Sequence, residues 1–477
     1  MKTNRSCNQA RTQGSVLVVA LTILAIAALV LGSYLVLVQT QTNSVSRSQT
    51  WNSAIAITEA GLEEGLAEVN RFSPTVGSNS IDTSPWGWTN NITQDGWSIF
   101  TNGQTSLTRN VSTNNAGTNG YTVMIDTSSG TPTITSAGFV AFTSTAWAAY
   151  GAPQPFLAAG GVTTATNLII GRRVQVQTVL SPLFSCAFII KSNLTMSGNG
   201  TTIDSFDSSN TNYSTGGQWD VNKRKAGGNV ATDSAIVNLS IGNGNIYGHV
   251  YTGPGTLQSQ VSVGSQGAVG DVAWNASHSG IEPGFWAGNF NTAIPDVPTP
   301  TFVGGALPGA NTNGPLKGSI VLSGGHYTVP SGGPSAPLVI TAPTSLWVQG
   351  SFSPAGITCT NSGSLVLYLG TTSTNGSDSF TCGSINTGGL AVNLQIFGLP
   401  SLTSITLSGN DNLAAAIYAP EATFTGNGGG SSGEFEGSLV VQSITLHGHF
   451  NIHYDESLVS SGASRGWIAK GWTELKY

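Results

Sequence analysis

A continuous apolar segment near the N-terminus constrains the fold of this chain more than any other feature. Residues 16–38 carry no charge, and only Thr22, Gly32, Ser33 and Tyr34 interrupt the aliphatic side chains. A helix needs about 20 such residues to cross the hydrocarbon core of a bilayer. The sequence therefore predicts a membrane-spanning helix at this place.

The residues on either side of this segment predict its orientation. Lys2, Arg5 and Arg11 precede it, and the positive-inside rule keeps such a basic leader in the cytoplasm. A polar stretch, residues 39–42, follows it where a cleaved signal peptide would have small residues. We therefore expect the helix to stay in the inner membrane, with the rest of the chain outside the cytoplasm, at the cell surface or in a pilus.

Apolar side chains continue at helical spacing beyond the membrane segment. Between residues 51 and 69 they recur every three or four positions, and the acidic side chains lie mostly elsewhere. The predicted helical segment spans residues 15–72, and its part from Ser15 to Asn70 would be roughly 80 Å long at 1.5 Å per residue. The expected buried stripe consists of Trp51, Ile55, Thr58, Leu62, Leu66 and Val69.

Two stretches of this helix resemble a known family. Residues 14–21 and residues 54–66, which include Glu59-Ala60-Gly61-Leu62, are similar to the N-terminal segment of PilX-type minor pilins of the type IV pilus system. The resemblance implies that residues 1–14 are a leader and that a prepilin peptidase cuts between Gly14 and Ser15. It also implies that the helix packs against other pilin or pseudopilin subunits.

One position departs from the pattern of the major pilins. The fifth residue after Gly14 is Val19, where major pilins carry a glutamate that pairs with the N-terminal amine of a neighbouring subunit. The resemblance therefore points to a minor or initiating subunit. A plain, uncleaved membrane anchor is the alternative, because hydrophobic helices of this length arise easily.

The composition of the chain favours an exported β-protein. Charged residues make up 8% of the chain and glycine supplies 62 residues, whereas roughly 25% charged residues is typical of soluble domains. Thr, Val and Asn suit strands and tight turns. Lys317 is the only basic residue between Lys225 and Arg465, so no basic stripe is available for nucleic acid.

Short alternating runs fill residues 73–182. Tyr121-Thr122-Val123-Met124-Ile125, residues 133–138 and residues 173–177 alternate in polarity and are bounded by Gly, Asn, Ser and Pro. Period-two runs with turn-rich flanks predict an antiparallel sheet. A helix followed by a small sheet is also the arrangement that the pilin resemblance implies.

Residues 183–460 show a different pattern, in which short β-rich runs end in glycine. Four such runs begin at Leu194, Ile405, Ala422 and Ile444, and repeats of this kind are typical of a solenoid whose coils stack on one another. We predict a right-handed parallel β-helix, with an excursion over residues 290–316. A β-sandwich or jelly roll is the alternative.

The end of the chain carries a second resemblance. Residues 416–456 resemble the C-terminal domain of uncharacterised bacterial proteins that accompany pilin-type anchors. Residues 461–477 are expected to form a C-terminal tail. The predicted fold is thus mainly β, with a long N-terminal α-helix, a small pilin-like antiparallel sheet and a β-helix.

Two sets of residues suggest sites in the β-rich part. Cys359 and Cys382 lie 23 positions apart in the sequence, close to one coil, so they are a candidate disulfide in an oxidising envelope. The histidine-rich end of the chain would place imidazole and carboxylate ligands on one side of a strand. We expect no functional metal there, although the candidate ligands are His447, His449, His453 and Asp455.

Other charged residues carry less weight. Asp204 and Asp207 suggest the paired carboxylates of carbohydrate-cleaving β-helices, but acids in turns more often bind their own backbone. Residues 223–225, Lys-Arg-Lys, are expected to be a solvated triplet. No phosphate loop or HExxH motif is present, and no catalytic residue is predicted.

Together these observations predict a non-enzymatic envelope protein that requires no cofactor. Its helix would join the membrane and other pilin or pseudopilin subunits, and its β-body would present a structural or adhesive surface to a polysaccharide or another surface ligand. A surface-anchored protein that binds or cleaves carbohydrate is the alternative.

Overall fold

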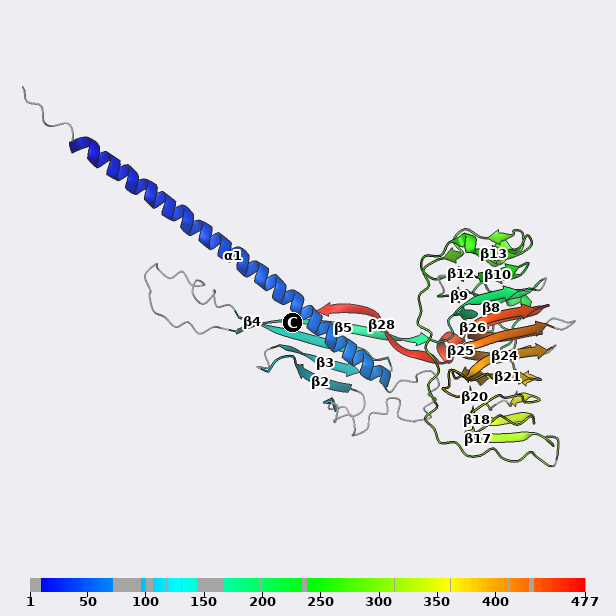
Figure 1. Cartoon of the computed structure of the whole chain (residues 1–477). Coiled ribbons are helices and arrows are strands. Elements are labelled where there is room, and N and C mark those ends of the chain that lie inside the picture. The colour runs from blue at the N-terminus through cyan, green and yellow to red at the C-terminus, as the bar shows by residue number, and fades with distance from the viewer. Residues whose placement is uncertain are drawn as a thin grey trace, which may run out of the picture. The chain divides into compact units, whose positions relative to one another are not determined.

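The computed structural model shows a chain of two compact units (Figure 1). The first contains the N-terminal helix and an antiparallel sheet, and the second contains residues 180–467. The structure describes residues 10–71, 96–99, 106–115, 119–129, 131–143, 167–197, 200–233, 238–312, 314–360, 362–409, 412–428 and 433–476.

Helix α1 (Ala10–Arg71) runs without interruption for 62 residues, a length of roughly 90 Å. It covers residues 15–71 of the predicted segment 15–72 and begins five residues before its expected start. The helix has the length and composition to cross a membrane. Figure 1 shows its N-terminal half as a single rod, with the antiparallel sheet beside its C-terminal half.

The sheet of the first unit has six strands in the order β1-β2-β3-β4-β5-β28. The C-terminal tail expected for residues 461–477 is therefore a wrong prediction, because most of this segment forms the edge strand beside β5. The strands are β1 (Ser98–Ile99), β2 (Ser106–Ser112), β3 (Gly120–Asp126), β4 (Thr133–Thr143), β5 (Asn167–Pro182) and β28 (Ser464–Leu475).

Small residues of α1 lie against this sheet. A Cβ atom on Gly61 would come within 2.8 Å of Cδ2 of Tyr121, and one on Gly65 within 2.6 Å of Cγ2 of Ile134. Such distances leave no room for a side chain, so glycine permits the close approach of helix and sheet. The stripe predicted from Trp51 to Val69 is displaced, because the buried positions are Ala54, Thr58, Gly61, Gly65, Glu68 and Val69.

A polar contact fixes the same interface. The backbone N–H of Gly138 donates to the Thr58 hydroxyl oxygen at 3.1 Å, and that hydroxyl donates to the carbonyl of Ala54 at 2.7 Å. Glu64 accepts a hydrogen bond from the Tyr121 hydroxyl and pairs with Arg109. Burial and the bond to Glu64 raise the pKa of Tyr121 to about 12.

The second unit is a parallel β-helix, as predicted. Its strands lie in three rows, and within each row neighbouring strands pair in parallel. The longer strands bend from one row into the next. The strands of the first half are β6 (Phe188–Ile190), β7 (Asn193–Met196), β8 (Thr202–Phe206), β9 (Val230–Thr232), β10 (Asn238–Gly242), β11 (Asn245–Tyr247), β12 (Val250–Tyr251), β13 (Val261–Val263), β14 (Ala268–Gly270), β15 (Gly280–Ile281) and β16 (Trp286–Ala287).

The second half of the β-helix begins after an irregular segment that includes the predicted excursion over residues 290–316. Its strands are β17 (Ile320–Val329), β18 (Leu338–Val348), β19 (Ile357–Cys359), β20 (Leu365–Leu369), β21 (Asp378–Cys382), β22 (Ile385–Asn386), β23 (Leu394–Gly398), β24 (Leu402–Gly409), β25 (Asn412–Gly428), β26 (Gly433–His447) and β27 (Phe450–Asp455). Short helices are η2 (Val221–Lys223), η3 (Gln258–Gln260), α3 (Val272–Asn275), η4 (Ala391–Asn393) and α4 (Leu458–Ser461).

The order of the coils does not follow the order of the sequence. One row of strands has the order β17, β18, β20, β23, β25, β26, β6, β9, β12, β16. The first strands of the β-helix therefore lie in the middle of the stack, and the coils reach one end of it at β16. The chain then crosses to β17 at the other end, and the remaining coils return to the middle. The last coil, with β26 and β27, pairs with the first coil, with β6, β7 and β8 (Figure 1).

Columns of apolar side chains form the core of the β-helix. Ile405, Phe424, Ile444 and Leu194 follow one another in register on four neighbouring strands, and all are buried. These are the runs that the sequence singled out. Burial of each such side chain stabilises the fold by about 1.5–3 kcal/mol relative to exposure, and no coil could bury its own column alone.

A second apolar cluster covers the outside of one row. It joins outward-facing residues such as Tyr368, Phe397 and Tyr418 to Ile294 and Val297 of the excursion. The hydroxyl of Tyr418 donates to the carbonyl of Pro295 at 2.5 Å. The excursion thus packs along the coils as it passes from one end of the stack to the other.

Candidate functional sites on the helix and on the β-helix

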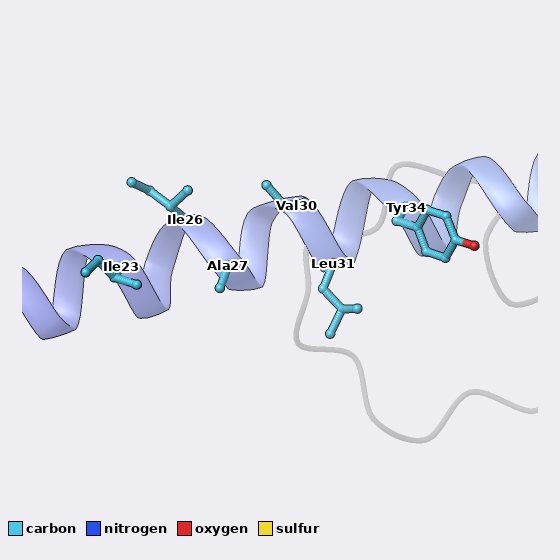
Figure 2. Close-up of a pocket in the computed structure, with 6 residues that line it drawn as sticks. All are labelled: Ile23, Ile26, Ala27, Val30, Leu31 and Tyr34. Carbon is cyan, nitrogen blue, oxygen red and sulfur yellow. The ribbon is translucent and has the colours of Figure 1, made fainter.

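The N-terminal half of α1 presents an apolar surface. Large apolar side chains from Val16 to Leu37 are 55–74% exposed. Figure 2 shows Ala27 and several of these side chains, among them Ile23, Leu31 and Tyr34, projecting from the helix. So much exposed apolar surface is unfavourable in water and favourable in lipid or against other apolar helices.

The predicted processing site lies within this helix. Because α1 begins at Ala10, the bond between Gly14 and Ser15 is in its second turn. The basic residues Lys2 and Arg5 lie outside the described residues.

A group of buried polar side chains lies where the last coil meets the first. Glu436 on β26 is in register with His453 on β27, and His453 is in register with Asp204 on β8. All three side chains point away from the apolar core, because their neighbours Phe435, Ile452 and Ile203 form it. We call Glu436, His453 and Asp204 the polar column.

The buried carboxyl group of Asp204 has partners on both sides. Asp204 is 0% exposed; its Oδ1 lies 2.6 Å from Nδ1 of His453 and its Oδ2 lies 2.6 Å from Nε of Arg224. The Arg224 guanidinium stacks over the ring of Tyr247 at 4.4 Å. Both oxygens of a buried carboxylate are thus engaged, which offsets the cost of removing its charge from water.

A loop covers the column, and we call residues 207–227 the strap. The indole of Trp219 stacks on the imidazole of His453 with ring centroids 3.8 Å apart. The backbone N–H of Trp219 donates to Glu436. Lys225 pairs with Glu456, and the Lys223 ammonium donates to the carbonyl of Ser214 at 2.6 Å. The basic triplet expected to be solvated is therefore bound into the strap and its anchors.

Glu436 is the unusual member of the column. It is 2% exposed, and its Oε2 has no hydrogen-bond partner among the described residues. Burial is the main reason why the pKa of Glu436 is raised to about 7; the nearby Glu434 and Asp455 add to the rise, and the bond from Trp219 opposes it. The Nε2 atom of His453 is also buried without a partner among these residues.

The four residues considered as metal ligands do not converge. His453 and Asp455 are buried, whereas His447 and His449 are exposed. Asp455 accepts hydrogen bonds from the backbone N–H groups of Ser208 and Ser457. The described residues contain no group of three or more His, Cys, Asp or Glu side chains placed to hold a metal ion.

The cysteine pair also differs from the expectation. Cys359 and Cys382 are both buried free thiols. The coil between them is longer than 23 residues, because Ile357 pairs with Ile385 and Ser353 contacts Thr381, 28 positions further on. The two cysteines therefore occupy different register positions, and the expected stacking is wrong.

Sequence reasoning found Asp204 and His453 but did not bring them together. Asp207 does bind its own turn, accepting from the backbone N–H of Ser209 at 3.0 Å. Asp204 does not, because its partners lie on the strap and on the last coil. Nothing in the sequence pattern near Glu436 indicated a buried carboxyl group.

Comparisons with known proteins do not identify a function for the chain. Residues 342–461 match a domain family of unknown function, DUF7305. No curated protein matches the chain. Among solved structures, the competence-associated pilin ComZ from Thermus thermophilus matches with a TM-score of 0.28 and 12% identity, over 89% of this chain and 97% of that one. A likeness at that TM-score carries no argument.

Proposed function

We propose that the protein is a non-enzymatic, membrane-anchored subunit of a type IV pilus or a related pseudopilus, of the minor pilin, PilX-like kind. One observation carries the proposal: a continuous helix is apolar and exposed from Val16 to Leu37 and packs on a sheet through Gly61 and Gly65. One end can thus enter lipid or a bundle of helices while the other holds a folded body.

The two stretches of α1 that carry the family resemblance have different roles in this proposal. The apolar stretch supplies the surface for the membrane and for other subunits. The Glu59–Gly65 stretch supplies the small residues that the sheet requires. In this arrangement the body lies outside the cytoplasm, attached to the inner membrane or carried into a fibre, and the β-helix presents a weakly charged surface for adhesion.

The carbohydrate-cleaving alternative has less support. Cleavage needs two carboxyl groups that reach a sugar. In the polar column, Asp204 is engaged by His453 and Arg224, and Glu436 lies beneath Trp219. Release of reducing ends from bacterial polysaccharides by the detergent-solubilised full chain would favour this alternative.

Processing in the native cell tests the proposal. N-terminal sequencing of the membrane-associated protein should begin at Ser15, and Gly14→Val should leave the leader attached without preventing membrane insertion. Gly32→Val is the matched control, because a Cβ atom at Gly32 meets nothing within 4 Å; this variant should still be cut. A native protein that begins at Met1, or beyond Thr40, would contradict the pilin-like function.

Cross-linking tests assembly separately. A photoreactive side chain placed at Leu24 or Leu31, both exposed on α1, should cross-link to pilin-type subunits in cells. The same group at Val303, which is fully exposed on the β-helix, serves as the control. Cross-links from the helix to lipid alone would indicate a simple anchor.

A further inference from the structure

The strap and the polar column offer a function that the membrane helix does not explain. The column lies at the seam between the first and last coils, and the strap is the segment that covers it. Asp204, Glu456 and Glu436 hold the strap through Arg224, Lys225 and the backbone of Trp219. Two of these anchors join groups of opposite charge. The third ends on Glu436, whose other oxygen has no partner among the described residues.

The surroundings of Glu436 are unfavourable to a negative charge. On its own strand lies Glu434, on the next strand Asp455, and beyond His453 lies Asp204. The cations of the strap are committed elsewhere: Lys223 binds carbonyl oxygens within the strap, Arg224 binds Asp204 and Lys225 binds Glu456. The imidazole of His453, next to Glu436, has its Nδ1 atom directed to Asp204. A charged Glu436 beneath the strap would therefore have acidic neighbours and little water.

We propose that the strap and the polar column form a proton-controlled latch, in which the strap stays closed while Glu436 is protonated and opens when Glu436 loses its proton. Opening exposes the Glu436 carboxylate to water and withdraws Trp219 from His453. The seam between the first and last coils then loses its cover, while the β-sheet pairing beneath it persists.

The direction of the pH response follows from linkage. In the closed state burial raises the pKa of Glu436 to about 7, and in the open state the group regains its ordinary value. The open state therefore binds fewer protons between these values, so rising pH favours opening. From pH 6 to pH 8 the opening equilibrium should shift by on the order of tenfold.

Hydrogen exchange followed by mass spectrometry on the detergent-solubilised full chain tests the latch. After correction for the chemical exchange rate, protection of peptides from residues 207–227 should fall about tenfold from pH 6 to pH 8. Peptides from β17, at the far end of the stack, should show no such change. Equal strap protection at both pH values in the wild-type protein would overturn the proposal, with no variant needed.

Two substitutions on the same strand assign the effect. Glu436→Gln removes the titrating group and should make strap protection independent of pH. Glu434→Gln is the matched control, because Glu434 is more exposed and two residues away; it should retain most of the pH response. A tenfold pH response that persists in Glu436→Gln would assign the latch to another group and reject this mechanism.

Discussion

The Nδ1 atom of His453 lies 2.6 Å from Oδ1 of Asp204, although 249 residues separate the two in the sequence. This contact joins the last coil of the β-helix to the first. In the described part of the stack, it lies at the seam where the coils that come first and last in the sequence pair with each other. Breaking one partner of such a buried pair leaves the other charge or polar group without compensation.

We expect Asp204→Ala to lower the free energy of unfolding by about 3–5 kcal/mol, because Arg224 and His453 would then lose their common partner. Urea unfolding of the solubilised full chain, followed by circular dichroism, measures this. Asp207→Ala is the matched control, since Asp207 binds only its own turn, and should cost less than about 1 kcal/mol. Equal losses in both variants would mean that the pair is not a principal contact of the seam.

Stability should also depend on pH through Glu436. Its folded-state pKa of about 7 lies above the ordinary value of 4.5, so its contribution is most favourable below pH 4.5 and is lost as pH rises to 7. At pH 8 the Glu436→Gln variant should therefore unfold at a higher urea concentration than the wild type, and its free energy of unfolding should be greater by at most about 3 kcal/mol. At pH 4.5 the two proteins should differ little. A variant that is less stable at pH 8 would show that the charged carboxylate is favourable.

The helix and sheet of the first unit should not tolerate a side chain at Gly61. Gly61→Val places methyl groups against Tyr121 and Ser136 and should cost about 1–3 kcal/mol through overpacking. Protease resistance of the sheet, measured on the solubilised protein, reports the loss. Gly32→Val, in the open part of the same helix, should leave resistance unchanged, and so distinguishes packing from helix propensity.

Cys359 and Cys382 should behave as inert thiols. Burial raises the pKa of Cys359 to about 12 and that of Cys382 to about 11, so the reactive thiolate is scarce at neutral pH. Both should resist maleimide labelling in the native protein and react fully in denaturant without a reducing agent. A requirement for reductant before labelling would show that a disulfide forms.

The sequence predicted those parts of the fold that depend on local pattern. The runs at Leu194, Ile405 and Ile444 were recognisable because each coil repeats the same alternation, and they stack as neighbours. The apolar helix was equally visible. The face of the helix that packs on the sheet was predicted wrongly. Glycine residues make the closest contacts with the sheet, and they do not contribute to a pattern of apolar side chains.

Features that depend on coil length and coil order could not be predicted. The cysteine pair failed because the coil after Ile357 is 28 residues long, and turns of variable length do not alter the strand pattern. The polar column was missed because Asp204 becomes a neighbour of His453 only after the segment between β16 and β17 has crossed the stack, and because the spacing of Glu436 and His453 in successive coils gives no sign of burial. No local signal records that crossing.

The strands of the first coil pair with those of the last coil. The β-helix therefore cannot be completed in the order in which it is synthesised. A nascent chain that ends near residue 290 has built one half of the stack, with Leu194 and Ile203 at a strand edge that is still unpaired. That edge stays open until Ile444 and Ile452 have been made and placed against it. Such non-local pairing slows folding and leaves an edge available to other chains.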